Sequence, residues 1–169
     1  MKHPLSFFDK IVTAEQAQQL VQRWRLFGQT TVFTNGVFDL LHEGHLFSLS
    51  EAAKEGDHLI IGLNADASVK KLKGPNRPIQ SESSRSKLLA ALPFVDAVVL
   101  FESDTPAELI ERIEPDVLVK GGDYTPEQIA GAESVLKRGG RIVINPILEG
   151  FSTTALIQKM QRPEAEGSS

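Results

Sequence analysis

Short apolar runs alternate along this chain with stretches in which apolar residues recur at helical spacing. Five runs rich in β-branched residues predict buried strands, at residues 31–35, 58–64, 95–101, 116–120 and 141–145. Strands separated by helices form a parallel sheet that is covered on both faces. We therefore expect an α/β fold, a single Rossmann-like, doubly wound domain with a five-stranded parallel sheet. Such sheets bind ligands at the carboxyl ends of their strands.

The helices are predicted from caps and breakers. Thr13 and Gln16 have the spacing of a capping box ahead of a lead helix at about residues 14–27. Further helices are expected at about 45–55, 68–72 and 81–92, then from Asp104 or Thr105, from Thr125-Pro126 to Gly139-Gly140, and from Ser152 to about 161. Residues 73–78 contain a glycine and two prolines, which predicts a loop. We expect one domain over 1–162 and a flexible tail over 163–169.

Composition excludes several classes of protein. The 18 basic and 22 acidic residues give a net charge of −4, which argues against a protein that coats nucleic acid. The absence of cysteine excludes a disulfide scaffold, a thiolate metal site and a cysteine nucleophile. No apolar run approaches the roughly 18–20 residues of a membrane span, and the first residues do not have a signal-peptide pattern. We expect a cytoplasmic protein without a membrane partner.

The loop after the first predicted strand carries the strongest candidate chemistry. It reads Thr34-Asn-Gly-Val-Phe-Asp-Leu-Leu-His-Glu-Gly-His45 and enters a helix. A helix start offers free N–H groups and a positive dipole end, so His42 and His45 there suit a polyphosphate, and Gly44 lets a phosphate approach the backbone. Asp39 is expected to orient a histidine or a nearby positive group. No further histidine or cysteine lies close, so we predict no metal site.

Two familiar phosphate fingerprints are missing from the chain. Neither Gly-x-Gly-x-x-Gly after the first strand nor Gly-x4-Gly-Lys-Ser/Thr is present, which argues against a dinucleotide dehydrogenase and a P-loop kinase. A basic cluster offers another way to hold anions: Lys70, Lys71, Lys73, Arg77 and then Arg85. The alternatives are a solvated loop and, for Arg85, an ion pair with Glu82.

Two later loops complete the candidate site. Val119-Lys-Gly-Gly-Asp-Tyr124 follows the fourth strand, where its glycines would admit a base or ribose; the alternative is a tight turn. Glu149-Gly-Phe-Ser-Thr-Thr154 precedes the last helix, where three hydroxyl groups and free N–H groups would hold an anion; the alternative is a plain serine cap.

These strings, in this order, resemble the cytidylyltransferase-like nucleotidyltransferase family, and within it the D-glycero-β-D-manno-heptose 1-phosphate adenylyltransferase group. The similarity runs from about Ile11 to Met160. Val37 stands where that group commonly has cysteine, and Phe151 stands where a polar or basic residue is frequent, which puts one phosphate contact in question. In that group the domain is often joined to a sugar kinase, so a separate heptose kinase is the expected upstream partner.

The resemblance implies that a sugar 1-phosphate attacks the α-phosphorus of ATP to give ADP-heptose, for lipopolysaccharide core or another surface glycan, and pyrophosphate. Mg²⁺ would bind mainly through the ATP phosphates, and a homodimer is expected. By resemblance, the catalytic residues are His42, His45 and Lys73; the nucleotide-binding residues are Thr34, Asn35, Gly36, Phe38, Gly44, Lys120, Gly121, Asp123, Gly150, Ser152, Thr153 and Thr154; and the substrate or phosphate residues are Asp39 and Arg85. The alternatives are a glycerol-3-phosphate cytidylyltransferase, an FMN adenylyltransferase and a nucleotide-sensing module without turnover.

Overall fold

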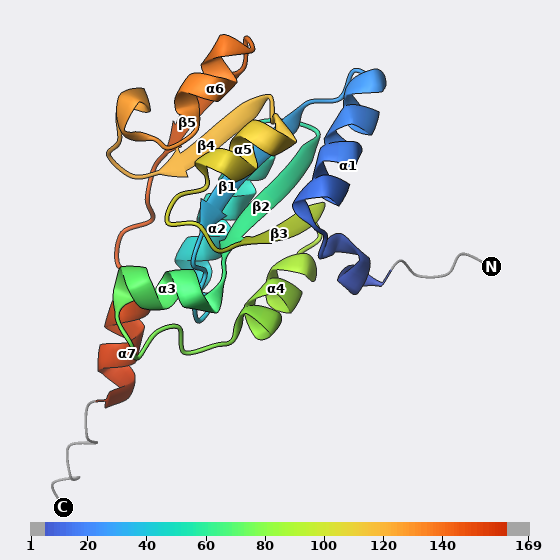
Figure 1. Cartoon of the computed structure of the whole chain (residues 1–169). Helices are drawn as coiled ribbons and strands as arrows, with labels where there is room; N and C mark the ends of the chain where they lie inside the picture. Colours follow the sequence, from blue (N-terminus) through green and yellow to red (C-terminus); the bar gives the residue numbers. More distant parts are fainter. Residues whose placement is uncertain (1–5, 162–169) are drawn as a thin grey trace, which may run out of the picture.

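A five-stranded parallel sheet forms the centre of the molecule (Figure 1), as the computed structural model of residues 6–161 shows. Its strands are β1 (Thr31–Gly36), β2 (His58–Asn64), β3 (Ala97–Phe101), β4 (Val117–Gly121) and β5 (Arg141–Asn145). They lie in the order β3-β2-β1-β4-β5, and every neighbouring pair is parallel. The predicted α/β, doubly wound fold is confirmed. The predicted tail, 163–169, lies outside the described residues.

Helices cover both faces of the sheet. They are α1 (Ala14–Leu26), α2 (Glu43–Ala53), α3 (Asp66–Lys73), α4 (Glu82–Ala90), α5 (Ala107–Ile113), α6 (Ala132–Lys137) and α7 (Thr153–Gln161), with short 3₁₀ turns η1 (Phe7–Lys10) and η2 (Pro126–Gln128). One hydrophobic cluster packs α1, α5 and α6 on the face that carries Phe33 and Ile60. A second cluster packs α2 and α4 on the face that carries Val32 and Ile61. The alternation of side chains along each strand supplies both clusters.

The order of the strands reverses beside β1. The chain runs outward from β1 to β2 and β3, then returns to the other side of β1 for β4 and β5. β1 and β4 pair only at Val32–Val117 and Phe33–Leu118, so their carboxyl ends are not joined by a ladder. The loops that follow these strands therefore face an opening at the switch point, which is where such sheets bind ligands.

Two helix boundaries differ from the prediction in ways that matter for the site. Helix α2 begins at Glu43 with His42 as its N-cap, two residues earlier than expected, so both histidines belong to its first turn. Helix α3 continues to Lys73 and ends at Gly74, whose φ of 103° is one that glycine adopts without strain. Lys73 therefore projects from the end of a helix and not from the following loop.

The prediction of one continuous helix from Thr125-Pro126 to Gly139-Gly140 is wrong, because two separate elements lie in this range. The range is divided into η2 and α6 by Gly131, which has φ +83° and packs so closely that a Cβ there would lie 2.7 Å from Cδ1 of Ile110. Neither Asp104 nor Thr105 caps α5, because Pro106 takes the N-cap position without a side-chain bond.

The remaining local predictions hold with small shifts of boundary. The capping box at Thr13 and Gln16 is present. Strand β3 begins at Ala97, two residues late, because the N–H of Val95 is bonded to Leu92 O in a turn. Within residues 6–161, no helix combines the length and the apolar character needed to cross a membrane.

Candidate active site

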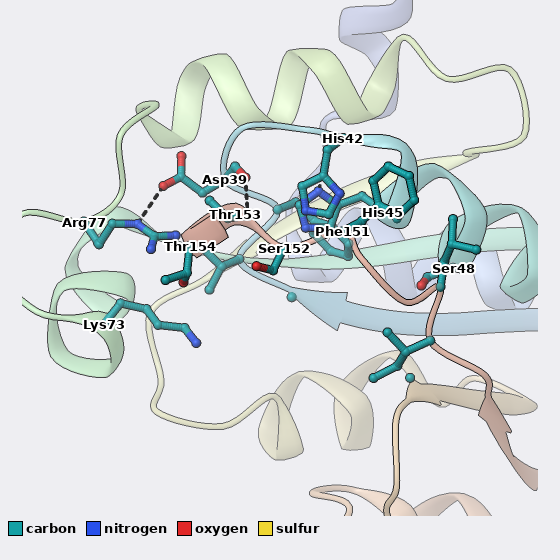
Figure 2. Close-up of a pocket in the computed structure, with 17 residues that line it drawn as sticks. Asp39, His42, His45, Ser48, Lys73, Arg77, Phe151, Ser152, Thr153 and Thr154 are labelled. Atoms are coloured by element: carbon teal, nitrogen blue, oxygen red, sulfur yellow. Dashed lines mark hydrogen bonds and ion pairs between the residues drawn. The ribbon is translucent and has the colours of Figure 1, made fainter. Parts of the chain in front are cut away.

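Two cavities open at the carboxyl ends of β1 and β4, each of about 410 Å³. They share Gly36, Val37 and Lys73 on their walls, so they meet beside the end of β1. The first cavity is lined by residues of the β1–α2 loop, of α2, of the loop after α3 and of the segment before α7 (Figure 2). The second is lined by the ends of β1, β2 and β4, the end of α3, and the segments that precede α5 and α6.

His42 and His45 form a stacked pair in the first cavity. Their ring centroids lie 3.7 Å apart with an interplanar angle of 21°. The backbone N–H of His42 donates to Nδ1 of His45 at 3.4 Å. Because that nitrogen accepts, the proton of the neutral imidazole sits on Nε2 and is available as a donor. The first turn of α2 adds its own N–H groups and positive dipole end.

Both imidazoles have a lowered pKa, which favours their neutral forms near pH 7. Burial, and then the neighbouring His42, lower the pKa of His45 to about 4, although Asp39 acts in the opposite direction. Burial also lowers the pKa of His42. The Nδ1 atom of His42 is buried without a hydrogen-bond partner among the described residues. The pair therefore offers uncharged imidazole N–H donors near neutral pH.

Asp39 ties three segments of the site together. Its buried carboxylate accepts from Ile79 N–H at 2.8 Å, from Gln80 N–H at 3.0 Å and from Nε of Arg77 at 3.0 Å. Its backbone oxygen accepts from the Thr153 hydroxyl at 2.9 Å. Burial by itself would raise the pKa of Asp39, but the bonds from Gln80, Ile79 and Arg77 together lower it. Asp39 thus joins the β1–α2 loop to the loop after α3 and to the start of α7.

Backbone strain surrounds Asp39. Phe38 and Leu40 have φ of 49° and 48°, in the left-handed region that non-glycine residues seldom adopt. Leu40 N–H donates to Oε1 of Gln80 at 3.2 Å, and this bond joins those of Asp39 in holding the loop. Residues in this conformation persist where surrounding contacts over-determine them, and they concentrate at functional sites.

Lys73 and Arg77 supply the cations of the first cavity. Figure 2 shows both side chains beside Thr154, with Arg77 bonded to Asp39. Lys73 lines both cavities, whereas Arg77 lines the first alone. The basic cluster predicted from the sequence therefore reaches the site through these two residues.

Arg85 has a different place from the one expected. Its side chain is 0% exposed, and it donates to the backbone oxygens of Val37, Asn64 and Gln80 and to Oδ1 of Asp66. It lines neither cavity. The expectation that Arg85 neutralises a substrate phosphate is corrected, because this guanidinium is enclosed by protein acceptors. The alternative pairing with Glu82 is also wrong, since the carboxylate partner is Asp66.

The hydroxyl cluster at the start of α7 faces the first cavity. Ser152, Thr153 and Thr154 all line it. Ser152 caps the helix by accepting from Ala155 N–H at 3.0 Å, so the plain capping role holds at the same time. Gly150 has φ +85° and lines neither cavity; it lets the chain turn into this segment.

Gly44 is enclosed by side chains. A Cβ at this position would lie 2.8 Å from Cβ of Phe151 and 3.1 Å from the ring of His42. Gly44 lines the first cavity, with Phe151 beside its Cα, and the approach of a phosphate to its backbone stays a prediction. The ring of Phe151 lies 6.5 Å from that of His42, nearly parallel, and forms part of the cavity wall.

The loop after β4 divides its residues between the cavities. Gly121 lines the first, whereas Lys120 lines the second and has its pKa lowered by burial. Asn35 also lines the second cavity, and Phe38 the first. Thr34 is buried within β1, and Asp123 is exposed. Neither residue lines either of the two cavities. The structure therefore does not bring Lys120 and Asp123 together around one nucleoside, as the sequence had predicted.

Several lining residues were not selected from the sequence. In the first cavity these are Ser48, Ile147 and Leu148, and in the second they include Asn64, Asp104, Thr105 and Gln128. Asn64 carried a usable signal, because it ends a predicted strand at the edge where ligands bind. The others lie in loops or in helices whose approach to the site depends on the packing of the whole sheet.

Comparisons with known proteins agree on one family. The cytidylyltransferase-like family matches residues 33–159. The chain is 55% identical over 151 residues to the bifunctional protein HldE of Caulobacter vibrioides and 50% identical over 151 residues to that of Gluconobacter oxydans. These alignments cover 89% of this chain but 31% and 32% of the relatives, so the chain spans about a third of their length.

Solved structures support the fold. The lipopolysaccharide core biosynthesis protein of Thermoplasma volcanium superposes with a TM-score of 0.57 at 31% identity, covering 72% of this chain and 98% of that one. The pantoate–β-alanine ligase of Francisella tularensis gives a TM-score of 0.57 at 15% identity, covering 87% and 75%. The second similarity bears on the fold alone.

Proposed function

Since the chain belongs to the cytidylyltransferase-like family of nucleotidyltransferases, we propose that it transfers AMP from ATP to D-glycero-β-D-manno-heptose 1-phosphate. The observation that carries this proposal is the pair of cavities, each with polar side chains in its wall, that meet at Lys73. One cavity has the donors that a triphosphate requires, and the other has the amide and hydroxyl groups that a sugar requires. The names of the relatives, HldE and a lipopolysaccharide core biosynthesis protein, support the choice of acceptor.

The reaction requires a single displacement at phosphorus. An oxygen of the acceptor's phosphate forms a bond to the α-phosphorus of ATP, and the bond from that phosphorus to the bridging oxygen of the β-phosphate breaks. The electron pair leaves with pyrophosphate, and ADP-heptose remains. The attacking phosphate is already ionised near neutral pH, so the site needs no strong general base. Catalysis rests on positioning and on stabilisation of negative charge.

The first cavity is assigned to the nucleotide. The Nε2–H of neutral His45 and the adjacent His42 donate to the phosphates while negative charge develops on the leaving group. The hydroxyls of Ser152, Thr153 and Thr154 and the first turn of α7 hold the β- and γ-phosphates. The apolar side chains of Ile147, Leu148 and Phe151 in the same wall suit the nucleoside.

The second cavity is assigned to the sugar phosphate. Its wall carries Asn35, Asn64, Asp104, Thr105 and Gln128, which can donate to or accept from sugar hydroxyls. Lys120 in the same wall, and Lys73 at the junction, provide positive charge for the acceptor's phosphate. Lys73 thus lies where the attacking phosphate and the α-phosphate would meet.

We propose that Mg²⁺ enters with the nucleotide, because the protein has few ligands to offer it. Residues 6–161 contain no group of three or more His, Asp or Glu side chains arranged to hold a metal. The carboxylate in the wall of the first cavity, Asp39, is already occupied by three donors. Bound to ATP oxygens and water, the ion would neutralise part of the phosphate charge.

The wider setting follows from the chemistry of the substrates. A kinase, on this polypeptide or on another, must supply the sugar 1-phosphate, and the ADP-sugar would be used in lipopolysaccharide core or another surface glycan. Consumption of ATP and a sugar phosphate is consistent with a cytoplasmic location. A homodimer stays a prediction, as does the absence of nucleic-acid partners, which rests on the net charge of −4.

Pyrophosphate release with Mg²⁺ tests this function. ATP and CTP are each offered with heptose 1-phosphate, glycerol 3-phosphate and FMN. We expect release only with ATP and heptose 1-phosphate. Release only with CTP and glycerol 3-phosphate, or only with FMN, would keep the displacement chemistry and overturn the acceptor. ATP binding without pyrophosphate release from any pair would favour a nucleotide-sensing module.

A further inference from the structure

We propose that Arg77 binds the pyrophosphate portion of the nucleotide and that Asp39 is the positioning residue that aims it. This inference deepens the proposed function and rests on it, since it assigns a residue to the leaving group of that reaction. It concerns a side chain that the sequence placed only in a general basic cluster. Its evidence is geometric, and it comes from the contacts of Arg77, from its neighbours and from the wall on which it lies.

The guanidinium of Arg77 is held at one end and open at the other. Its Nε donates to Oδ2 of Asp39 at 3.0 Å, and its side chain is 16% exposed. Among residues 6–161, its two terminal nitrogens take part in no hydrogen bond or ion pair. A guanidinium has five N–H donors, so four remain for a ligand.

Asp39 orients the side chain of Arg77, and the Asp39 carboxylate is itself held in place by donors other than Arg77. The carboxylate already accepts two backbone N–H groups, from Ile79 and Gln80, which fix it relative to the loop that carries Arg77. On either side of it, Phe38 and Leu40 have left-handed φ, and the N–H of Leu40 donates to Oε1 of Gln80. Because Nε of Arg77 donates to the fixed carboxylate of Asp39, the two terminal nitrogens of the guanidinium point away from Asp39. Figure 2 shows these nitrogens directed toward Thr153 and Thr154.

The neighbours of Arg77 indicate which phosphate it meets. In the first cavity, Arg77 lies with Lys73 and the hydroxyls of the Ser152–Thr154 segment (Figure 2). Arg77 does not line the second cavity, whereas Lys73 lines both. Lys73 therefore suits the junction between the acceptor and the α-phosphate, and Arg77 suits the part of the triphosphate that leaves. An arginine fork matches two phosphate oxygens, as pyrophosphate presents them.

Calorimetric titration with inorganic pyrophosphate tests this assignment on the unliganded protein. We expect Arg77→Gln to weaken pyrophosphate binding by about 10- to 100-fold, as for loss of charge-assisted hydrogen bonds. Arg77→Lys should restore little of it, because an ammonium cannot both bond Asp39 and present a fork. Arg112→Gln is the matched control: Arg112 is exposed on α5 and lines neither cavity, so it should bind pyrophosphate as the wild type does.

Asp39 is tested by coupling to Arg77. Asp39→Asn should also weaken pyrophosphate binding, and the double variant with Arg77→Gln should be little weaker than Arg77→Gln alone. Independent, additive losses would overturn the positioning role. Steady-state kinetics provide a second readout: Arg77→Gln should lower kcat/KM for ATP and leave KM for the acceptor nearly unchanged. A rise confined to the acceptor's KM would place Arg77 on the wrong phosphate.

The two proposals fail in different ways. If turnover is found but Arg77→Gln binds pyrophosphate as tightly as the wild type, the assignment of Arg77 is wrong and the transferase function stands. If pyrophosphate binds through Arg77 but no acceptor is turned over, the function is wrong and the anion site stands. If the wild type does not bind pyrophosphate at all, the assignment of Arg77 is overturned directly.

Discussion

His45 owes its chemical state to its neighbours. An imidazole in water has a pKa near 6.5, but burial against His42 in the first turn of α2 lowers the pKa of His45 to about 4. The neutral ring has one donor, on Nε2, because Nδ1 accepts from the backbone N–H of His42. This arrangement gives the site a directed donor without a permanent charge, which suits a ligand whose negative charge increases during reaction.

Replacement of His45 should affect the reaction far more than the fold. We expect His45→Gln to reduce pyrophosphate release by about 10²- to 10³-fold, as for loss of one charge-stabilising donor. The measurement is the rate at saturating ATP and acceptor, with Arg112→Gln as the control. Unchanged turnover in His45→Gln would remove the assigned role of the histidine pair.

The lowered pKa of His45 also predicts a dependence of stability on pH. The folded-state pKa, about 4, lies below the unfolded value of 6.5, so the unfolded chain binds more protons between these values. The contribution of His45 to stability is therefore fully present above pH 6.5 and is lost as the pH falls toward 4. Urea unfolding across this range should show a shallower decline in the free energy of unfolding for His45→Gln.

In NMR titrations, pyrophosphate should raise the pKa of His45, because an anion favours the protonated ring.

At the scale of elements, glycines decide where α6 begins and ends. Gly131 and Gly139 both have left-handed φ, of +83° and +81°. They differ in their surroundings, because a Cβ at Gly131 would lie 2.7 Å from Ile110, whereas one at Gly139 would meet nothing within 4 Å. The sequence marked Gly139 as a helix end but not Gly131 as a break, since the second depends on the packing of α5 against α6.

This pair gives a matched test of local conformation against packing. Gly139→Ala should cost about 1–2 kcal/mol of unfolding free energy, the penalty of a left-handed non-glycine residue. Gly131→Ala should cost about 2–4 kcal/mol, because overpacking against Ile110 is added to the same penalty. Urea denaturation measures both. Equal losses would show that the close approach to Ile110 carries no energetic weight.

At the scale of the whole molecule, Arg85 binds together segments that form the floor of the site. It lies on α4 and donates to Val37 O after β1, to Asn64 O at the end of β2, to Gln80 O and to Asp66. The buried guanidinium of Arg85 thus holds together the segments around the opening at the switch point. Arg77, eight positions earlier, lines the first cavity instead. Two arginines of one basic stretch therefore have different tasks.

Arg85→Met should destabilise the fold by about 3–5 kcal/mol, because it leaves a carboxylate and buried carbonyls without their donor. Arg77→Gln should cost only about 1 kcal/mol, since Asp39 keeps two backbone donors. Denaturant unfolding of both variants, beside their pyrophosphate affinities, separates the structural cation from the ligand-binding one. A small loss for Arg85→Met would contradict its bracing role.

The sequence by itself determined the order of the strands, most of the helices, the capping box at Thr13, and the segments that carry His42, His45, Lys73 and Ser152. It did so because periodicity, caps and breakers act over a few residues and are visible along the chain. Only the tertiary structure decided that Arg85 is enclosed, that Arg77 is directed into a cavity, and that Lys120 and Gly121 face different cavities. The physical reason is that burial, pKa and cavity walls depend on groups far apart in sequence, which meet only when the sheet assembles.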